Sequence, residues 1–324
     1  MKRWLPMLGG IAVLLVLAAL PLLLTAYPVS VASRILAFAL LVVSVDLLTG
    51  LTGLPSLGQI AYFGVGAYTA GLVGIHWTSN LVVQLGCGVA VALVVAAVTG
   101  ALAVRTSGVV FLMVTLAIGE LTHRVADGMT LVGASNGLAG IPGPTLLPGG
   151  EPIVLVGYLY WWVLAVSVLG FTAAVIVSRS PLGRSMRAVR ESPTRLAAVG
   201  QRGYAVKLVA YAFAGALAGA AGTAWAVQAR FVSPGDIAFS VSALALLSVV
   251  LGGAGTLWGP VLGAAVVVLV RDWLSGYLDG HGELVLGLLF VVAVFLLPRG
   301  IAGARAWRPA VAPPSAPHSL GSTA

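Results

Sequence analysis

Long apolar runs, interrupted by short polar segments, make up most of this chain. Most runs approach the roughly 20 residues that an α-helix needs to cross a bilayer. Of 324 residues, 60% are hydrophobic and only 8% are charged, whereas soluble domains average about 25% charged residues. A soluble fold could not cover its surface with so few charges, so lipid must cover much of it. The sequence therefore predicts an all-α, polytopic membrane protein.

We expect about ten transmembrane helices, some of them short or broken. The third, eighth and ninth runs are short or rich in glycine, and these are the ones we expect to be broken or re-entrant. Eight spans, like ten, would place both termini on the same side of the membrane. The predicted membrane domain covers residues 1–302, and a Pro-rich disordered tail covers 303–324. The predicted spans are 5–25, 35–51, 57–75, 81–103, 108–125, 154–177, 207–228, 240–252, 258–270 and 283–298.

The distribution of charge predicts which side each loop occupies. Residues 178–207 contain seven cationic side chains and one acid, Glu191. Because Lys and Arg are retained on the cytoplasmic side, we expect this segment to be a cytoplasmic loop and both termini to be cytoplasmic. Residues 126–153 contain no Lys or Arg and are predicted to form an external loop. The net charge of +8 then reflects a cytoplasmic rim that can touch anionic lipid, and not nucleic-acid binding. Four cations remain outside: Arg34, Arg124, Arg230 and Arg271.

A short helix is predicted inside the basic loop. Ser192 and Pro193 resemble an N-cap followed by proline at the first helical position. Gly200 is a natural stop about two turns later. Such a helix could seat in a groove of a soluble partner and transmit motion to the neighbouring spans. Alternatively, its arginines anchor it in the lipid headgroups.

Two apolar segments, residues 50–58 and 252–260, combine Gly with Pro or Ser. Interrupted helices in both halves of a membrane chain can mark a translocation site, but tight turns between helices would give the same pattern. Asp46 and Glu120 lie within predicted spans, where acids are costly and often functional. We favour structural roles for them, with Asp46 capping a neighbouring helix and Glu120 paired with Arg124.

Signals for catalysis are absent from the sequence. No His, Cys or Glu spacing suits a metal, and no nucleotide-binding P-loop occurs. We therefore expect neither an enzyme nor a cofactor in this chain. An ion-coupled secondary transporter of small neutral solutes, with a proton on Asp46 or Glu120, is the alternative transport mechanism.

Several motifs, in order along the chain, resemble those of a known family, the LivM-type permease subunit of branched-chain (hydrophobic) amino-acid ABC importers. The similar segments are residues 53–68, 111–120, 136–137, 141–142, 180–191, 252–264 and 298–300. The resemblance implies a bacterial plasma membrane protein that pairs with a second, homologous permease. Two cytoplasmic ATPases would drive it, and an extracytoplasmic binding protein would deliver the substrate. Relatives of this kind also carry urea or short amides, which is a further alternative.

The resemblance also implies roles for particular residues. Residues 192–195 depart from the usual acidic, Ala-rich start of the family's ATPase-contacting loop, although Ala197, Ala198 and Gly200 remain. The residues expected to couple to the ATPase are Arg190, Glu191, Ser192, Pro193, Arg195, Ala197, Ala198 and Gly200. Those expected along the substrate pathway are Ser56, Gly58, Gln59, Phe63, Gly64, Thr115, Glu120, Gly252, Gly253 and Gly255.

Overall fold

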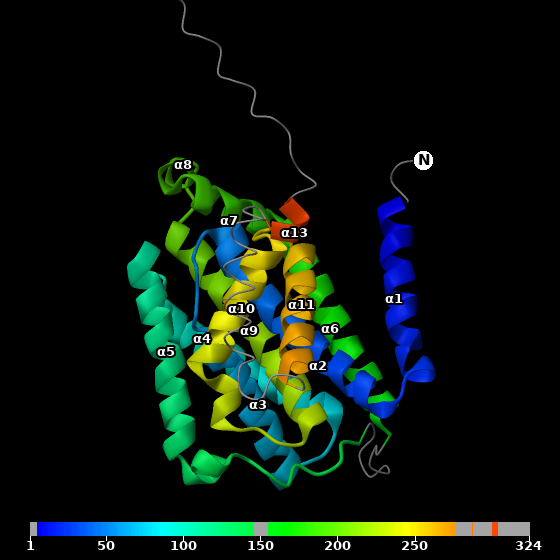
Figure 1. Ribbon diagram of the computed structural model, residues 1–324. Helices are drawn as coiled ribbons and strands as arrows, with labels where there is room; N and C mark the ends of the chain where they lie inside the picture. Colours follow the sequence, from blue (N-terminus) through cyan, green and yellow to red (C-terminus); the bar gives the residue numbers. More distant parts are fainter. Residues whose placement is uncertain (1–4, 146–154, 276–286, 288–299, 304–324) are drawn as a thin grey trace, which may run out of the picture.

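The computed structural model describes residues 5–145, 155–275, 287 and 300–303, and every regular element in that part of the chain is a helix (Figure 1). Nearly all of the tenth predicted span and of the predicted tail lie outside the described residues. The long helices are α1 (Leu5–Leu23), α2 (Ala26–Asp46), α3 (Gln59–His76), α4 (Leu81–Ala103), α5 (Gly108–Gly128), α6 (Val156–Arg179), α9 (Gly203–Ala229), α10 (Phe239–Gly252) and α11 (Trp258–Ser275).

The short elements connect these helices. They are η1 (Leu47–Thr52, a π-helix), η2 (Thr130–Val132), η3 (Ala134–Asn136), α7 (Pro181–Glu191), α8 (Pro193–Ala198), η4 (Pro234–Ile237) and α13 (Gly300–Gly303). A helix thus lies at each of the first nine predicted spans. Among the described residues, five helical segments are long and apolar enough to cross a membrane. The prediction of an all-α polytopic membrane protein is confirmed.

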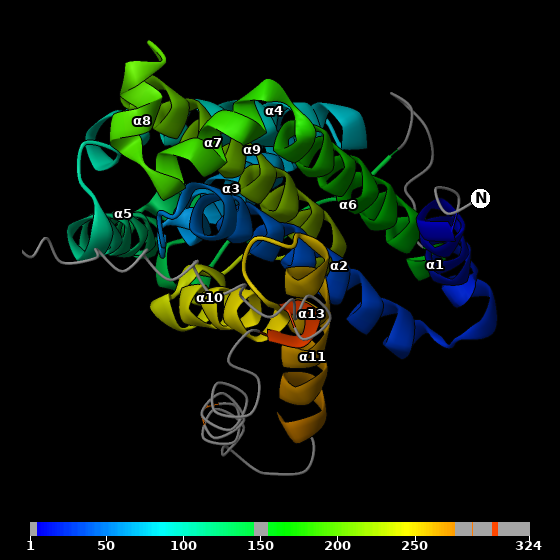
Figure 2. The ribbon, with the colours of Figure 1, turned by 90° about the horizontal axis from the view of Figure 1, so that it is seen from above.

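Helices α3 and α9 form the centre of the bundle, and α1 and α5 lie at opposite edges (Figure 2). Small residues allow the central backbones to approach closely, as the stripes of small residues predict. A Cβ atom on Gly222 would overlap the carbonyl group of Phe63. A polar link also joins α3, α4 and α9. The Tyr62 hydroxyl lies 2.6 Å from Thr99 Oγ1 and donates to the Tyr211 hydroxyl at 2.9 Å.

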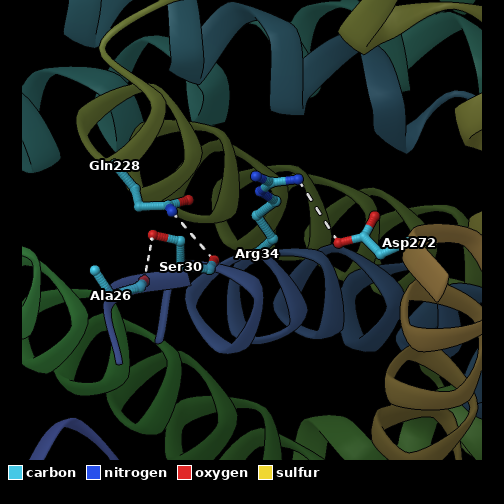
Figure 3. Close-up of polar contacts among 5 residues, drawn as sticks. All are labelled: Ala26, Ser30, Arg34, Gln228 and Asp272. Carbon is cyan, nitrogen blue, oxygen red and sulfur yellow. Dashed lines mark hydrogen bonds and ion pairs between the residues drawn. The ribbon is translucent and has the colours of Figure 1, made fainter. Parts of the chain in front are cut away.

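The second predicted span begins too late, because α2 starts at Ala26 and not at residue 35. Its early polar residues are accommodated within the helix. The hydroxyl of Ser30 donates to the carbonyl of Ala26 at 3.0 Å. The guanidinium of Arg34, expected in an external loop, lies 3.6 Å from the carboxylate of Asp272 on α11 (Figure 3). A charge that resembled the end of a span is instead held between two helices by a partner.

The predicted external loop at 126–153 is partly helical. Helix α5 continues to Gly128, and η2 and η3 follow it. The chain then pairs with the segment after α9, because Leu138 N donates to Val232 O at 2.7 Å and Val232 N donates to Leu138 O at 3.2 Å. Ile141 is buried beside this pairing. The described part of the segment therefore packs onto the end of the bundle opposite α7 and α8 (Figure 1).

Candidate functional site

The two glycine-rich segments singled out in the sequence meet in the structure. The Asp46 carboxylate is fully buried, and it accepts hydrogen bonds from Gly255 N at 2.6 Å and from Leu257 N at 3.2 Å. A Cβ atom on Gly50 would overlap the backbone of Gly255. We call this contact between residues 46–53 and 253–257 the glycine junction. It connects the end of α2 to the turn between α10 and α11.

The backbone of this turn explains why it needs an acid beside it. Gly253, Gly255 and Leu257 all have positive φ angles, of 101°, 87° and 60°. The turn therefore cannot satisfy its own N–H groups as a helix would, and the first N–H groups of α11 also need acceptors. Asp46 supplies a charged acceptor to two of the N–H groups. The structural role favoured for Asp46 is confirmed, and residues 253–257 form a tight turn between α10 and α11.

The basic loop contains two helices. Helix α8 begins after Ser192, whose hydroxyl accepts from Arg195 N at 3.4 Å, and Gly200 follows it with a φ of 79°. This confirms the short helix that the sequence predicted. Helix α7 was missed, although Ser180 and Pro181 repeat the same Ser-Pro start. That dipeptide, followed by apolar residues at the helical spacing of four and three positions (Leu182, Met186 and Val189), was the signal that could have revealed α7.

Helix α7 is attached directly to the glycine junction. The guanidinium of Arg190 donates a hydrogen bond to the carbonyl of Gly50. The stem of the same side chain covers Gly53, where an added Cβ would lie 2.7 Å from Arg190 Cγ. Since Gly53 has a φ of 72°, the close approach and the backbone both favour glycine there. A displacement of α7 would therefore act on η1 and on the turn before α11.

Helix α8 offers an exposed apolar surface. Leu196 is its only buried residue, and it holds the helix against the bundle. Ala197 and Ala198 are exposed, and the side chain of Val199 is 79% exposed. Figure 1 shows α7, α8 and α13 together at one end of the bundle.

The predicted pathway residues separate into two groups, the first of which lies at the start of α3. Thr115 Oγ1 on α5 accepts from Leu57 N at 3.3 Å, and Gly58 N donates to Ser56 Oγ at 3.2 Å. A Cβ atom on Gly58 would lie 2.8 Å from the carbonyl oxygen of Thr115. These contacts pack the irregular segment before α3 tightly against α5.

Three further pathway residues follow along α3. Gln59 is 1% exposed, and neither polar atom of its side chain has a hydrogen-bond partner among the described residues. The ring of Phe63 lies 6.2 Å from that of Trp225, centroid to centroid. Gly64 faces Ile237, whose Cγ2 would lie 2.6 Å from an added Cβ.

The second group lies where α10 meets the glycine junction. Gly252 is the last residue of α10, and Gly253 and Gly255 belong to the turn that follows it. Glu120 joins neither group. It forms the expected i, i+4 ion pair with Arg124 at 2.8 Å, and its side chain is 44% exposed. The structure thus does not bring the ten residues into one site, and their role in a pathway stays a prediction.

The described residues contain no cluster of three or more His, Cys, Asp or Glu side chains that could hold a metal ion. The chemistry available at the glycine junction is hydrogen bonding and packing. Such an arrangement can transmit movement between helices. The expectation that this chain carries no cofactor stays a prediction.

Comparison with known proteins identifies the family. Residues 27–297 match a family model described as "Branched-chain amino acid transport system / permease component". The chain belongs to this permease family. The permease is accordingly a membrane-embedded protein, as its long apolar helices indicate.

Three relatives illustrate the similarity. The permease is 28% identical to the high-affinity branched-chain amino acid transport system permease protein LivM of Salmonella typhimurium, over 90% of this chain and 73% of that protein. The corresponding values for LivM of Escherichia coli are the same. The permease protein BraD of Pseudomonas aeruginosa is 31% identical over 49% of this chain and 55% of its own length. No solved structure matches the chain.

Proposed function

We propose that this permease is the membrane-spanning subunit of an ABC importer that moves branched-chain or related amino acids into the cell. The relatives named above are branched-chain amino acid permeases. The observation that carries the mechanism is the attachment of α7 to the glycine junction through Arg190. It connects a basic surface helix to the backbone of two membrane segments more than 200 residues apart.

The end that carries α7 and α8 faces the cytoplasm in this proposal, because the seven cations of residues 178–207 gather there. Both termini are then cytoplasmic. The exposed apolar residues at the end of α8 and directly after it, Ala197, Ala198 and Val199, form the contact with an ATPase. Apolar residues on a cytoplasmic surface gain from burial against a partner. The complete importer contains two ATPases, a second homologous permease and an extracytoplasmic binding protein.

Movement passes from the ATPase to the membrane through four contacts. The ATPase displaces α8, and α8 displaces α7, which immediately precedes it. Arg190 then moves the carbonyl of Gly50 in η1, and Asp46, at the end of α2, carries the movement to the turn between α10 and α11. ATP can drive this change only if the ATPase pair binds one arrangement of α8 more tightly than the other.

An ion-coupled mechanism has less support. Both carboxylate oxygens of Asp46 accept backbone hydrogen bonds, so this side chain is engaged in holding the turn before α11. Glu120 is bonded to Arg124 along its own helix. Neither acid is therefore assigned a role as a proton carrier, and the permease itself is assigned no catalysis.

The ATPase contact is tested by Ala197→Trp in the complete importer. A large side chain at the centre of the exposed surface should block close contact, so ATP hydrolysis continues while amino-acid uptake falls. Ala90→Trp is the matched control, because Ala90 is an exposed alanine on α4 and its replacement should leave coupling unchanged. Gly200 is a poorer test site, since its φ of 79° strains any other residue. Normal uptake per ATP hydrolysed in Ala197→Trp would refute the assignment.

A further inference from the structure

A cavity of about 410 Å³ lies between α2, α3, α9, α10 and α11. Its volume is within the range of about 300–1,000 Å³ that is typical of small-molecule sites. The cavity is distant from the glycine junction. Arg34, on its wall, precedes Asp46 by 12 positions on α2, which separates the two by roughly 18 Å along the helix. The cavity therefore lies toward the end of the bundle opposite α7 and α8.

Charges of both signs line this cavity in equal number: Arg34, Arg271, Asp236 and Asp272. The Arg34–Asp272 pair is loose, since its 3.6 Å separation exceeds the ~2.8 Å of a direct charge-assisted hydrogen bond. Both side chains are accessible, with exposed fractions of 42% and 22%. Figure 3 shows Arg34 extending from α2 toward Asp272 on α11. Asp236 is held in place by the backbone N–H and the hydroxyl of Ser233, both of which donate to its Oδ2 atom.

The remaining wall is apolar and aromatic. Phe38, Phe63, Trp225 and Leu244 contribute to it. The indole N–H of Trp225 is buried and has no hydrogen-bond acceptor in the described part of the chain. Aromatic faces attract cations, and an unsatisfied buried donor favours a polar ligand atom nearby.

We propose that this cavity binds the zwitterion of an apolar amino acid within a single permease subunit. The carboxylate of the ligand inserts beside Arg34 and Arg271, where guanidinium groups offer paired donors. Its ammonium group lies between Asp236 and Asp272. Its side chain packs against the wall that contains Phe38 and Leu244. This inference rests on the proposed function for the choice of ligand, and it adds a binding site inside the subunit.

The charge pattern distinguishes an amino acid from the alternative substrates. Urea and short amides carry no net charges, so they would leave four charged side chains without new partners. A zwitterion replaces the loose ion pair with two charged contacts and remains neutral overall. The site thus predicts that both charged groups of the ligand are required.

The test is binding of radiolabelled L-leucine to the full-length permease in lipid nanodiscs. Arg34→Gln and Asp272→Asn should each weaken binding by about tenfold to a hundredfold, as expected for lost hydrogen bonds to charged groups. Asp127→Asn is the matched control, because Asp127 is an exposed acid on α5 that does not line the cavity, and its replacement should leave the affinity unchanged. Leucinamide and N-acetyl-leucine should compete at least about tenfold more weakly than leucine.

A second variant keeps the proposal testable if the charge substitutions prevent the permease from folding. Leu244→Trp fills the cavity from α10 without altering the ion pair, and it should also weaken leucine binding. Wild-type affinity in Leu244→Trp and Asp272→Asn, or equal competition by leucinamide, would overturn the proposal. Leucine uptake by the assembled importer is a separate measurement. If uptake is normal while the permease binds no leucine, the cavity proposal fails and the proposed function stands. If the wild-type importer takes up no amino acid, the proposed function fails.

Discussion

Replacement of Asp46 is expected to destabilise the permease by several kcal/mol. The carboxylate is buried and accepts hydrogen bonds from Gly255 N and Leu257 N. Hydrogen bonds to charged groups contribute about 1.5–3 kcal/mol each, so Asp46→Ala should lower the free energy of unfolding by about 3–6 kcal/mol. Asp46→Asn retains one acceptor oxygen and should fall between Asp46→Ala and the wild type.

The free energy of unfolding can be measured by titration with sodium dodecyl sulfate from mild detergent. Glu120→Gln serves as the control, because it removes an acid of comparable size from an exposed ion pair, worth about 0.3–0.5 kcal/mol. If Asp46→Ala were as stable as Glu120→Gln, the carboxylate would not hold the turn before α11. Asp46→Asn also tests the ion-coupled alternative, which requires loss of uptake even in the variant protein that remains folded.

Three further changes test the packing and the coupling route. Gly222→Ala should destabilise the permease by about 1–3 kcal/mol through overpacking. The control, Gly86→Ala, should be tolerated because there is open space around Gly86. Equal effects of the two variants on unfolding in detergent would contradict the close approach of α3 and α9. Gln59→Met should raise the free energy of unfolding by about 1–3 kcal/mol if its buried amide is unsatisfied; a loss of stability would show that the amide has a partner. Arg190→Met should reduce uptake per ATP hydrolysed by removing the bond to the glycine junction, whereas Arg184→Met, at an exposed arginine of the same helix, should not. Equal coupling ratios in the two variants would exclude Arg190 as the link.

Features with a local cause were accessible from the sequence. The helix between Ser192 and Gly200 is bounded by its own cap, first-turn proline and terminal glycine, and these signals act within a few residues. The pairing of Glu120 with Arg124 follows from helical spacing alone. The spans were accessible for a similar reason, because each must carry its own apolar surface.

Features that depend on distant partners were not accessible. Arg34 resembled the end of a span, because its partner Asp272 lies more than 200 residues later in the chain. The bond from Arg190 to Gly50 likewise requires knowledge of which helix ends meet. Asp46 could be assigned a capping role, but not the particular turn that it caps.

The most direct test of the central claim is the energy source for uptake. The permease, its homologous partner and the ATPases would be reconstituted in liposomes, with binding protein and radiolabelled leucine outside and ATP inside. The account predicts uptake that requires internal ATP, persists when a protonophore collapses the proton gradient, and is lost in Ala197→Trp. Uptake that continues without ATP and stops with the protonophore would contradict it.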